Sequence, residues 1–230
     1  MRRYLIVGVF TVLLSLVGDD TFAQEAKKSP PPNPVAVNAP HDPRNARPIE
    51  LSPKQVELVR QVNGYFNQLT ILKGTFTQTS ADNKRQRGKF HIMRPGRFRF
   101  EFSPPSKVVI ISDGKHVAIQ DHDLKTDDRW DLSYTPFRAL LQKDVNLLQD
   151  ANIFDVREDQ EAIAIAFEDK SAEASSRIKL FLTTKPALQL KAWIAKDAQG
   201  FDTRTDLSDL TKIDAVDQQL FNPAAPIERR

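Results

Sequence analysis

The fold class is decided by the stretch RFRFEF at residues 97–102, which alternates three phenylalanines with three charged side chains. Side chains of a β-strand point to opposite faces in turn, so one face of this segment is apolar and the other is charged. A strand with two such faces is typical of an antiparallel sheet that covers a core on one side and meets water on the other. The stretch therefore predicts an antiparallel sheet with an apolar inner face.

The same period of two recurs on both sides of this stretch. Alternating segments occur at residues 72–78, 89–92, 117–119, 163–167, 178–182 and 188–194. The continuous apolar run at 108–111 and the polar segment at about 201–212 are predicted as further strands. In the segment 188–194 the alternation predicts one apolar face formed by Leu188, Leu190, Ala192 and Ile194. We count about eleven strands with short connections. They predict one strongly curved antiparallel sheet, a half-open β-barrel, in a single domain at residues 52–226.

Three segments have a helical period instead. Residues 52–55 form a capping box, and an apolar stripe at three- and four-residue steps extends this helix to about Gln68. A second, short helix is predicted up to Leu141, with Thr135 as its N-cap. A further helical turn is expected at residues 145–148. The fold class is therefore mainly β with a few helices.

The first residues predict export. Arg2 and Arg3 precede an apolar run of 14 residues, and the small residue Ala23 closes the segment. This pattern predicts a secretory signal peptide at residues 1–23 that is cleaved after Ala23, and hence a periplasmic protein. Residues 24–51 hold seven of the fifteen prolines and no aromatic residue. We expect this segment to be a flexible tether that folding does not require.

Composition excludes several classes of protein. The 230 residues include no cysteine, which excludes disulfide scaffolds, cysteine zinc sites, thiol nucleophiles and a lipid-modified N-terminal cysteine. The formal charge of +3 gives a weak field, so no nucleic-acid partner is expected. The aromatic residues comprise 14 Phe against 3 Tyr and 2 Trp, and Phe suits surfaces that stay away from water.

No catalytic site is expected. The chain lacks the nucleophile-elbow, zinc-protease and phosphate-loop motifs, and no nucleophile–base pair is visible. The sequence Asp121-His122-Asp123 is the one polar cluster with metal-ligand chemistry. It follows a strand directly, and three adjacent residues do not converge easily on one ion, so we interpret it as a solvated turn. We predict no metal, no cofactor and no enzymatic activity.

A run of seven basic residues without an acid lies between Lys84 and Arg99. Its ordinary interpretation is the solvated face of a hairpin, which we favour narrowly. The alternative is an electrostatic docking surface for an acidic protein or for anionic lipid headgroups.

The inner faces of the strands supply candidate residues for binding an apolar ligand. These candidates are Phe76, Phe90, Ile92, Phe98, Phe100, Phe102, Ile110, Val117, Ile119, Ile165 and Phe167. A sheet of about eleven strands encloses a space that must be filled, which favours a binding site. The alternative is that these side chains only form a packed core.

An ordered set of short motifs resembles a known family, the periplasmic outer-membrane lipoprotein carrier LolA. The set comprises LKGTFTQ at 72–78, GKF at 88–90, MRPGRFRFEF at 93–102, ISDGK at 111–115, TPF at 135–137 and LF at 220–221. The resemblance covers roughly residues 52–222. It implies a half-open barrel whose apolar cavity lies under a helical lid.

The resemblance also implies a function. Its cargo is the acyl chains of lipoproteins that move from the inner to the outer membrane. The implied partners are acylated lipoproteins, an inner-membrane lipoprotein-release transporter and an outer-membrane receptor, with the carrier itself a monomer. Arg94 is implied as the latch that hydrogen-bonds backbone carbonyls of the lid, and Phe137, Leu140 and Leu141 belong to the lid helix.

Two departures from the family pattern bear on the cargo. The family usually has Trp at the position of Phe100, and aromatic residues near Ala118 and Gln120. Fewer aromatic side chains predict a wider cavity or a different cargo. A function of another class therefore stays open, that of a periplasmic sensor or adaptor that uses the barrel as an interaction scaffold for lipid or protein.

Overall fold

The computed structural model describes residues 47–171, 177–196 and 201–223. The predicted signal peptide and the tether up to residue 46 lie outside the described residues. The helices are α1 (Pro53–Asn67), α2 (Arg138–Leu141) and α3 (Leu147–Asp150), with two short 3-10 helices η3 (Leu132–Tyr134) and η4 (Gln218–Phe221). The strands are β1 (Ile71–Thr79), β2 (Arg85–Met93), β3 (Arg97–Phe102), β4 (Val108–Asp113), β5 (His116–Asp121), β6 (Thr126–Asp131), β7 (Ala151–Asp159), β8 (Ala162–Asp169), β9 (Arg177–Thr183), β10 (Gln189–Lys196) and β11 (Asp202–Lys212).

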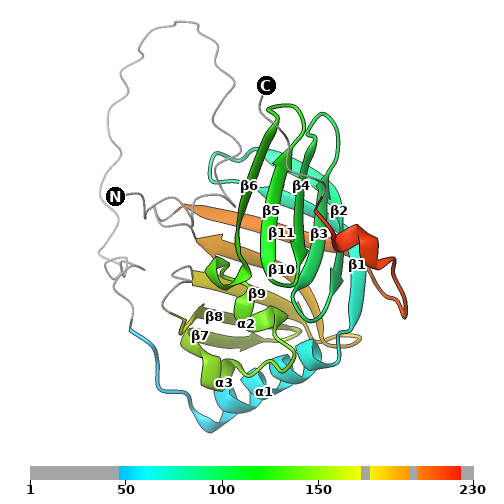
Figure 1. Ribbon diagram of the computed structural model, residues 1–230. Coiled ribbons are helices and arrows are strands. Elements are labelled where there is room, and N and C mark those ends of the chain that lie inside the picture. Colours follow the sequence, from blue (N-terminus) through cyan, green and yellow to red (C-terminus); the bar gives the residue numbers. More distant parts are fainter. Residues whose placement is uncertain (1–46, 172–176, 197–200, 224–230) are drawn as a thin grey trace, which may run out of the picture.

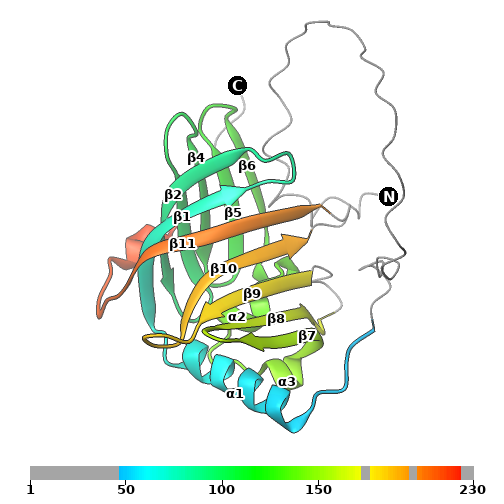
Figure 2. The same ribbon diagram turned by 180° about the vertical axis from the view of Figure 1, so that it is seen from behind.

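All eleven strands form one sheet in the order β6-β5-β4-β3-β2-β1-β11-β10-β9-β8-β7. Each described pair is antiparallel, for example β1 with β11 and β2 with β3. The sheet curves strongly, so that β6 and β7 become the two edges of an open barrel (Figures 1 and 2). Helices α1 and α3 cross one end of the barrel, and α2 lies on its concave side (Figure 1). The predicted fold class is confirmed.

Helix α1 begins where the sequence predicts. Ser52 Oγ accepts a hydrogen bond from the Gln55 backbone N–H at 3.3 Å, and Gln55 Oε1 accepts one from the Ser52 N–H at 2.9 Å. This reciprocal pair satisfies two N–H groups that a helix start otherwise leaves unpaired. The buried face of α1 includes Leu58, Val59 and Val62, which join the large apolar cluster on the inner face of the sheet.

The prediction that Thr135 caps the second helix is wrong. Helix α2 follows Phe137, which makes no side-chain cap. The Thr135 hydroxyl instead donates to the Leu132 carbonyl at 2.9 Å and thereby closes η3. Thr135 is buried, so its hydroxyl needs a partner, and the carbonyl three residues earlier is the partner within reach.

The predicted face of residues 188–194 is also wrong in its second half. The pairing of β10 with β9 shifts register between Leu190 and Ala192, which marks a β-bulge at Lys191. An extra residue in one strand reverses the faces of all residues beyond it. Trp193 therefore points inward and lies opposite Leu180, whereas Ile194 lies on the outer face.

The two edges of the sheet differ in their cover. The first turn of α1 and the residues before it cover the edge of β7. The Ile49 N–H donates to the Ile153 carbonyl at 2.9 Å, and Gln55 Nε2 donates to the Val156 carbonyl at 3.1 Å. The end of the predicted tether thus contacts the barrel. Strand β6 carries exposed charged side chains, which discourage pairing with another chain.

A separate apolar cluster lies on the convex face. Ile71 and Met93 pair across β1 and β2, and Phe221 of η4 covers them and is itself only 1% exposed. Arg99 Nη1 donates to the Leu220 carbonyl at 3.3 Å. The segment after β11 is thereby fixed to the outside of the sheet (Figure 1).

Candidate functional site

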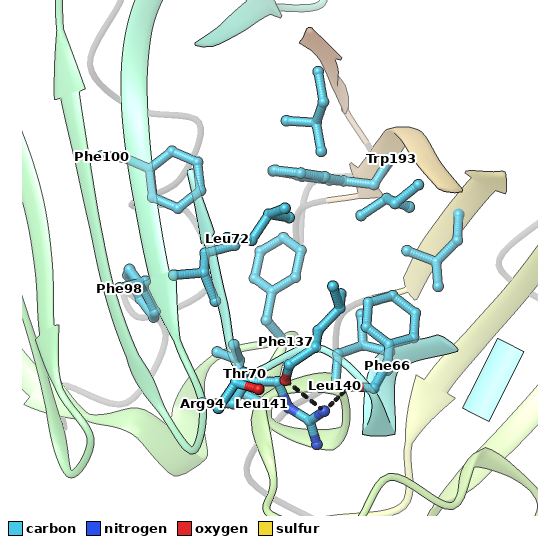
Figure 3. A pocket seen from close by; sticks show the side chains of 15 residues that line it. Phe66, Thr70, Leu72, Arg94, Phe98, Phe100, Phe137, Leu140, Leu141 and Trp193 are labelled. Atoms are coloured by element: carbon cyan, nitrogen blue, oxygen red, sulfur yellow. Dashed lines mark hydrogen bonds between the residues drawn. The ribbon is translucent and has the colours of Figure 1, made fainter. Parts of the chain in front are cut away.

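A small cavity of about 80 Å³ lies between the concave face of the sheet, the end of α1 and the lid helix α2 (Figure 3). Its lining residues come from eight strands and helices and from the loops beside them. They are Phe66, Leu69, Thr70, Leu72, Ile92, Arg94, Phe98, Phe100, Phe137, Leu140, Leu141, Leu180, Leu190, Trp193 and Leu207. All but Thr70 and Arg94 are apolar, so the cavity offers a ligand dispersion contacts and almost no hydrogen bonds.

Aromatic rings build the wall of the cavity. Phe100 stacks on Phe90 with ring centroids 5.3 Å apart, and its edge-to-face contacts include Phe98 at 5.9 Å and Trp193 at 6.2 Å. Phe137 contacts Trp193 edge to face at 5.5 Å. The Phe137–Trp193 contact joins the segment of α2 to strand β10, so the lid is seated on the far half of the sheet (Figure 3).

The other end of the lid is held by Arg94, which follows β2. Its Nη1 donates to the backbone carbonyls of Phe66 and of Leu69, the latter at 3.4 Å. Its Nη2 donates to the Gln142 carbonyl and to the Lys143 carbonyl, the latter at 3.1 Å. One guanidinium therefore joins the sheet to the end of α1 (Figure 3) and to the segment that follows α2. These are carbonyl contacts of the kind that the resemblance implies.

Arg94 is half-buried, and burial lowers the pKa of its guanidinium, against the opposing charge of Asp144. Among the described residues, Arg94 Nε is buried without a hydrogen-bond partner. An arginine nevertheless keeps its charge, because its ordinary pKa lies far above neutral pH. The contact is thus a set of charge-assisted hydrogen bonds with one donor left unsatisfied.

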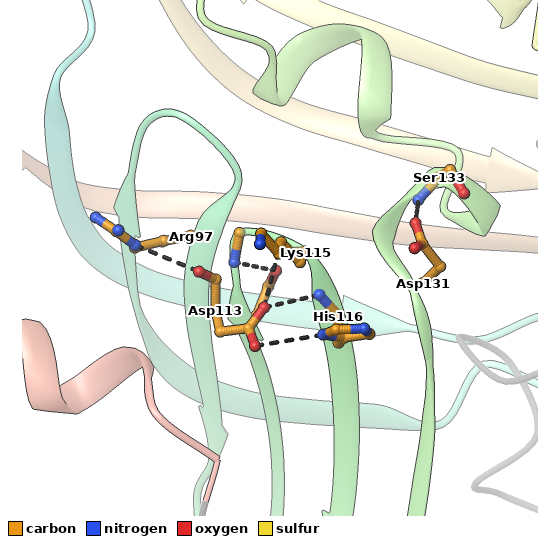
Figure 4. A network of polar contacts seen from close by, with 8 residues as sticks. Arg97, Asp113, Lys115, His116, Asp131 and Ser133 are labelled. Atoms are coloured by element: carbon orange, nitrogen blue, oxygen red, sulfur yellow. Dashed lines mark hydrogen bonds and ion pairs between the residues drawn. The ribbon is translucent and has the colours of Figure 1, made fainter.

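The remaining polar clusters have structural roles. Asp113 accepts hydrogen bonds at 2.7 Å from the N–H groups of both Lys115 and His116, and these bonds shape the turn between β4 and β5 (Figure 4). Burial acts to raise the pKa of Asp113, but the hydrogen bonds from His116 and Lys115 outweigh it, so the pKa lies below its ordinary value. Asp131 likewise caps η3 by accepting from the Ser133 N–H at 2.8 Å (Figure 4).

The Asp121-His122-Asp123 sequence forms a turn. Asp121 Oδ1 accepts from the N–H groups of Asp123 at 2.9 Å and Leu124 at 3.0 Å, and Asp123 pairs with Lys107 at 2.7 Å. Within the described residues, no three His, Cys, Asp or Glu side chains gather closely enough to hold a metal ion. Nor is any described helix both long and apolar enough to cross a membrane.

The basic run between residues 84 and 99 is divided by the fold. Lys84 pairs with Asp82 at 3.0 Å, and Lys89 and Arg99 both pair with Glu101, at 3.0 and 2.6 Å. Arg94 turns to the lid instead. The structure therefore supplies several of these charges with local partners, which agrees with the interpretation of a solvated hairpin face.

The family model described as outer membrane lipoprotein carrier protein LolA matches residues 67–224. The chain belongs to the LolA family. A relative named outer-membrane lipoprotein carrier protein, from Halorhodospira halophila, is 26% identical over 187 residues, which are 77% of this chain and 86% of the relative. A protein of the same name from Chromobacterium violaceum is 36% identical over 77 residues, 32% of this chain and 37% of the relative. Among solved structures, a LolA superfamily protein from Nitrosomonas europaea aligns with a TM-score of 0.43 at 8% identity, over 76% of this chain and 99% of that one.

The structure divides the residues that were predicted to bind an apolar ligand into two groups. Ile92, Phe98 and Phe100 line the cavity, as do the three predicted lid residues and Arg94. The others lie outside the lining of this closed state, in the apolar clusters around it, namely Phe76, Phe90, Phe102, Ile110, Val117, Ile119, Ile165 and Phe167. That these residues contact cargo remains a prediction.

Several lining residues escaped the sequence reasoning as cavity residues. They are Phe66, Leu69, Thr70, Leu72, Leu180, Leu190, Trp193 and Leu207. The apolar stripe of α1 contains Phe66 and Leu69, and a helix with such a stripe must cover an apolar surface, so this signal was available. Trp193 had no such signal, because the bulge that turns it inward does not show in the alternation.

Only one of the two departures from the LolA pattern reaches the cavity. Phe100 lines it, but Ala118 pairs with Ile111 and Gln120 with Val109, on the face of the sheet opposite to Ile110 and Ile119. The expectation that Ala118 and Gln120 widen the cavity is therefore wrong. Gln120 instead donates to Asp127 Oδ2 at 2.7 Å on the neighbouring strand.

Proposed function

We propose that this protein is a periplasmic carrier that holds the acyl chains of lipoproteins under its lid and moves them from the inner to the outer membrane. Membership of a family of carriers supports this function, and so does the predicted signal peptide. Each buried methylene contributes about 0.8 kcal/mol, so an apolar site of modest size keeps a lipid anchor out of water. The carrier acts without catalysis and without a cofactor.

The observation that carries the proposal is an apolar cavity closed by a separate lid. At about 80 Å³ the cavity is too small for a lipid, since ligand sites usually hold about 300–1,000 Å³. Cargo must therefore displace the lid helix α2 and the side chains of Phe137, Leu140 and Leu141.

Closure then competes with cargo. With α2 over the cavity, Arg94 satisfies the carbonyls of Phe66 and Gln142, and the lid side chains occupy the space that an acyl chain would take. A ligand shifts such an equilibrium only by its differential affinity for the two states. The energy of closure thus lowers the affinity for cargo and favours its release, and no external energy source is needed for that step.

Further parts of the proposal concern partners. We expect the cargo to be received from an inner-membrane lipoprotein-release transporter and delivered to an outer-membrane receptor, with the carrier a monomer throughout. The predicted cargo-binding residues outside the closed cavity, such as Phe102 and Ile119, become wall residues when the lid opens. The neighbouring apolar clusters that contain them support this extension of the site.

The proposal is tested with vesicles that contain one lipoprotein with radiolabelled acyl chains and the transporter that releases it. The mature protein should bring label into the soluble fraction as an equimolar complex, and acceptor membranes should remove it. The Phe100→Asp variant, which places a charge in the cavity wall, should bring no label into the soluble fraction. Soluble protein that emerges without label would contradict the carrier function and would favour the sensor or adaptor.

A further inference from the structure

A buried ion pair holds the first residue of α2. Arg138 Nη2 lies 2.6 Å from Asp169 Oδ1, at the end of β8. The Asp169 side chain is fully buried, with 0% of its surface exposed, and that of Arg138 is 29% exposed. Arg94 binds the other end of α2, where Gly96 N–H also donates to the Leu141 carbonyl at 2.9 Å. The lid helix is thus fastened at both ends, to opposite halves of the sheet.

The pair is incompletely hydrogen-bonded. Asp169 Oδ1 also accepts from the Ser171 N–H at 2.8 Å. Among the described residues, however, Asp169 Oδ2 and Arg138 Nε are buried and have no partner. Removing two charges from water costs more than their attraction returns unless further hydrogen bonds satisfy them, so such a pair contributes little to the stability of the closed state.

The aspartate belongs to a part of the barrel that is held independently of α2. Lys170, the next residue, donates its N–H to the Asp150 carbonyl at 2.9 Å and its Nζ to the Gln149 carbonyl at 2.7 Å. These two bonds fix the end of β8 to α3. When α2 leaves the cavity, Asp169 therefore stays in place and Arg138 moves away from it.

We propose that Arg138 and Asp169 form a second clamp on the lid, which sets how readily α2 opens. The inference rests on the proposed carrier function, in which α2 must leave the cavity. Opening breaks the ion pair but returns both charged groups to water, and their hydration there offsets the attraction that held them together. The clamp positions α2 over Trp193 while keeping the closed state only slightly favoured.

This arrangement predicts opposite effects of single and double substitution. Arg138→Met leaves Asp169 buried without its counterion, so the lid should open to hydrate it. Arg138→Met combined with Asp169→Leu removes both desolvation costs and leaves apolar contacts, so the lid should close at least as firmly as in the parent protein. If the pair were an ordinary structural salt bridge, these substitutions would instead lower the free energy of unfolding without opening the lid.

Trp193 reports the position of the lid, because it is 8% exposed and contacts Phe137. In a Trp130→Phe background, quenching of Trp193 fluorescence by acrylamide measures opening without any cargo. We expect Arg138→Met to raise the quenching constant and to tighten binding of a pyrene-labelled fatty acid by about tenfold or more, because closure competes with the probe. The double variant should return both values to those of the parent or below them.

Arg177→Met is the matched control, because its pair with Glu168 at 2.9 Å joins β8 to β9 and is also partly buried. It should leave Trp193 as protected as in the parent. Trp193 protection that is unchanged in Arg138→Met, or a double variant as open as the single one, would overturn the clamp. If Arg138→Met does not fold, Asp169→Asn carries the same test, and unchanged quenching again overturns it. A parent protein that binds no fatty-acid probe would contradict the carrier function, yet the quenching experiment would still decide the clamp.

Discussion

Helices α1 and α2 both cover the inner face of the sheet, but packing holds α1 to a greater extent than α2. Helix α1 has 15 residues and a complete capping box, and its buried face joins the large apolar cluster on the inner face of the sheet. Helix α2 has four residues and no side-chain cap. Two arginines hold its ends, through Asp169 and through backbone carbonyls. Packing also contributes, because Ala139, Leu140 and Leu141 of α2 are buried in the apolar clusters, but α1 buries six residues against these three. The smaller packed face makes α2 the cover that the proposed function requires to move.

Side chains of α1 also mark where the removable part ends. Asn67 accepts from the Val145 N–H at 2.7 Å and donates to the Val145 carbonyl at 3.0 Å. Asn63 accepts from the Leu147 N–H at 3.1 Å. These bonds tie the start of α3 to α1. Under the proposed function, we therefore expect movement of the lid to be confined to the segment between η3 and Val145, which contains α2.

The largest expected effect separates the packed core from the cavity wall. Phe90 and Phe100 stack on one another, but Phe90 is 1% exposed and Phe100 lines the cavity. An ionised carboxylate in a closed core costs more than the few kcal/mol by which a domain is stable, so Phe90→Asp should fail to fold. Phe100→Asp should fold, because water can enter the cavity when the lid opens, and it should lose binding of a pyrene-labelled fatty acid.

Circular dichroism and probe titration on the two variants measure this difference. The matched change Phe100→Leu should fold and still bind the probe, which separates the effect of the charge from that of removing the ring. If Phe100→Asp is also unfolded, the cavity wall is part of a closed core and the comparison between the two covers fails.

The second effect compares one leucine from each helix. Leu58 of α1 and Leu140 of α2 are both 5% exposed. Truncation of a buried Leu to Ala costs about 2–5 kcal/mol, and the cost depends on how the site adapts to the smaller side chain. We expect Leu58→Ala to cost an amount in this range. Leu140→Ala should cost less than half as much, because Leu140 faces existing free space and α2 can detach locally.

Urea denaturation of the two variants gives the two free energies of unfolding. Equal losses would show that α2 is as much a part of the core as α1. A larger loss for Leu140→Ala than for Leu58→Ala would reverse the assignment of the two helices.

The difference between the two covers also explains how far the sequence could be interpreted. The capping box and stripe of α1 are local signals, so its start and extent were predictable. Alternation located the inner strands, including RFRFEF, because each must present one apolar face. The sequence did not identify the edge strands β6 and β7. Parts of these strands face solvent or helices, so their apolar and polar residues alternate less clearly.

The cavity depends on features that no local pattern contains. Trp193 enters it through a bulge, and Arg94 reaches it by contacts with residues 66 and 142, far away in the chain. The sequence also cannot distinguish an inner side chain that lines free space, such as Phe98, from one that is packed, such as Phe167. That distinction depends on where α2 rests, which is a tertiary property.

The third prediction concerns the latch at the second end of α2. Hydrogen bonds to a charged group contribute about 1.5–3 kcal/mol, so Arg94→Leu should weaken closure by an amount in this range. The variant should accept lipoprotein as readily as the parent. Because every 1.4 kcal/mol is about tenfold, it should release cargo to acceptor membranes at least about tenfold more slowly. Uptake and delivery must be measured separately.

Arg94→Lys is the graded control for that variant. Lysine keeps the charge but lacks the planar fork that reaches several carbonyls at once, so its delivery rate should lie between those of the parent and Arg94→Leu. Delivery by Arg94→Leu at the parental rate would remove Arg94 from the release step and leave Arg138 as the charged contact of the lid.

The smallest expected effect is a pH dependence that acts on the sheet and not on either cover. His91 lies on the convex face of β2. Its pKa is lowered from 6.5, chiefly by burial and further by Lys73, Lys89 and Arg99, while Glu101 acts in the opposite direction. The native state therefore binds this proton less readily than the unfolded chain does. The stability from neutral His91 is complete above the unfolded pKa of 6.5 and declines as pH falls through the lowered folded value.

Thermal unfolding should show a small loss of stability over this pH window, and His91→Gln should abolish that loss. Acrylamide quenching of Trp193 should stay constant over the same window, because the lid lies on the other side of the sheet. A pH-dependent Trp193 would show that protonation reaches the lid, and the separation between the fixed sheet and its removable cover would then have to be given up.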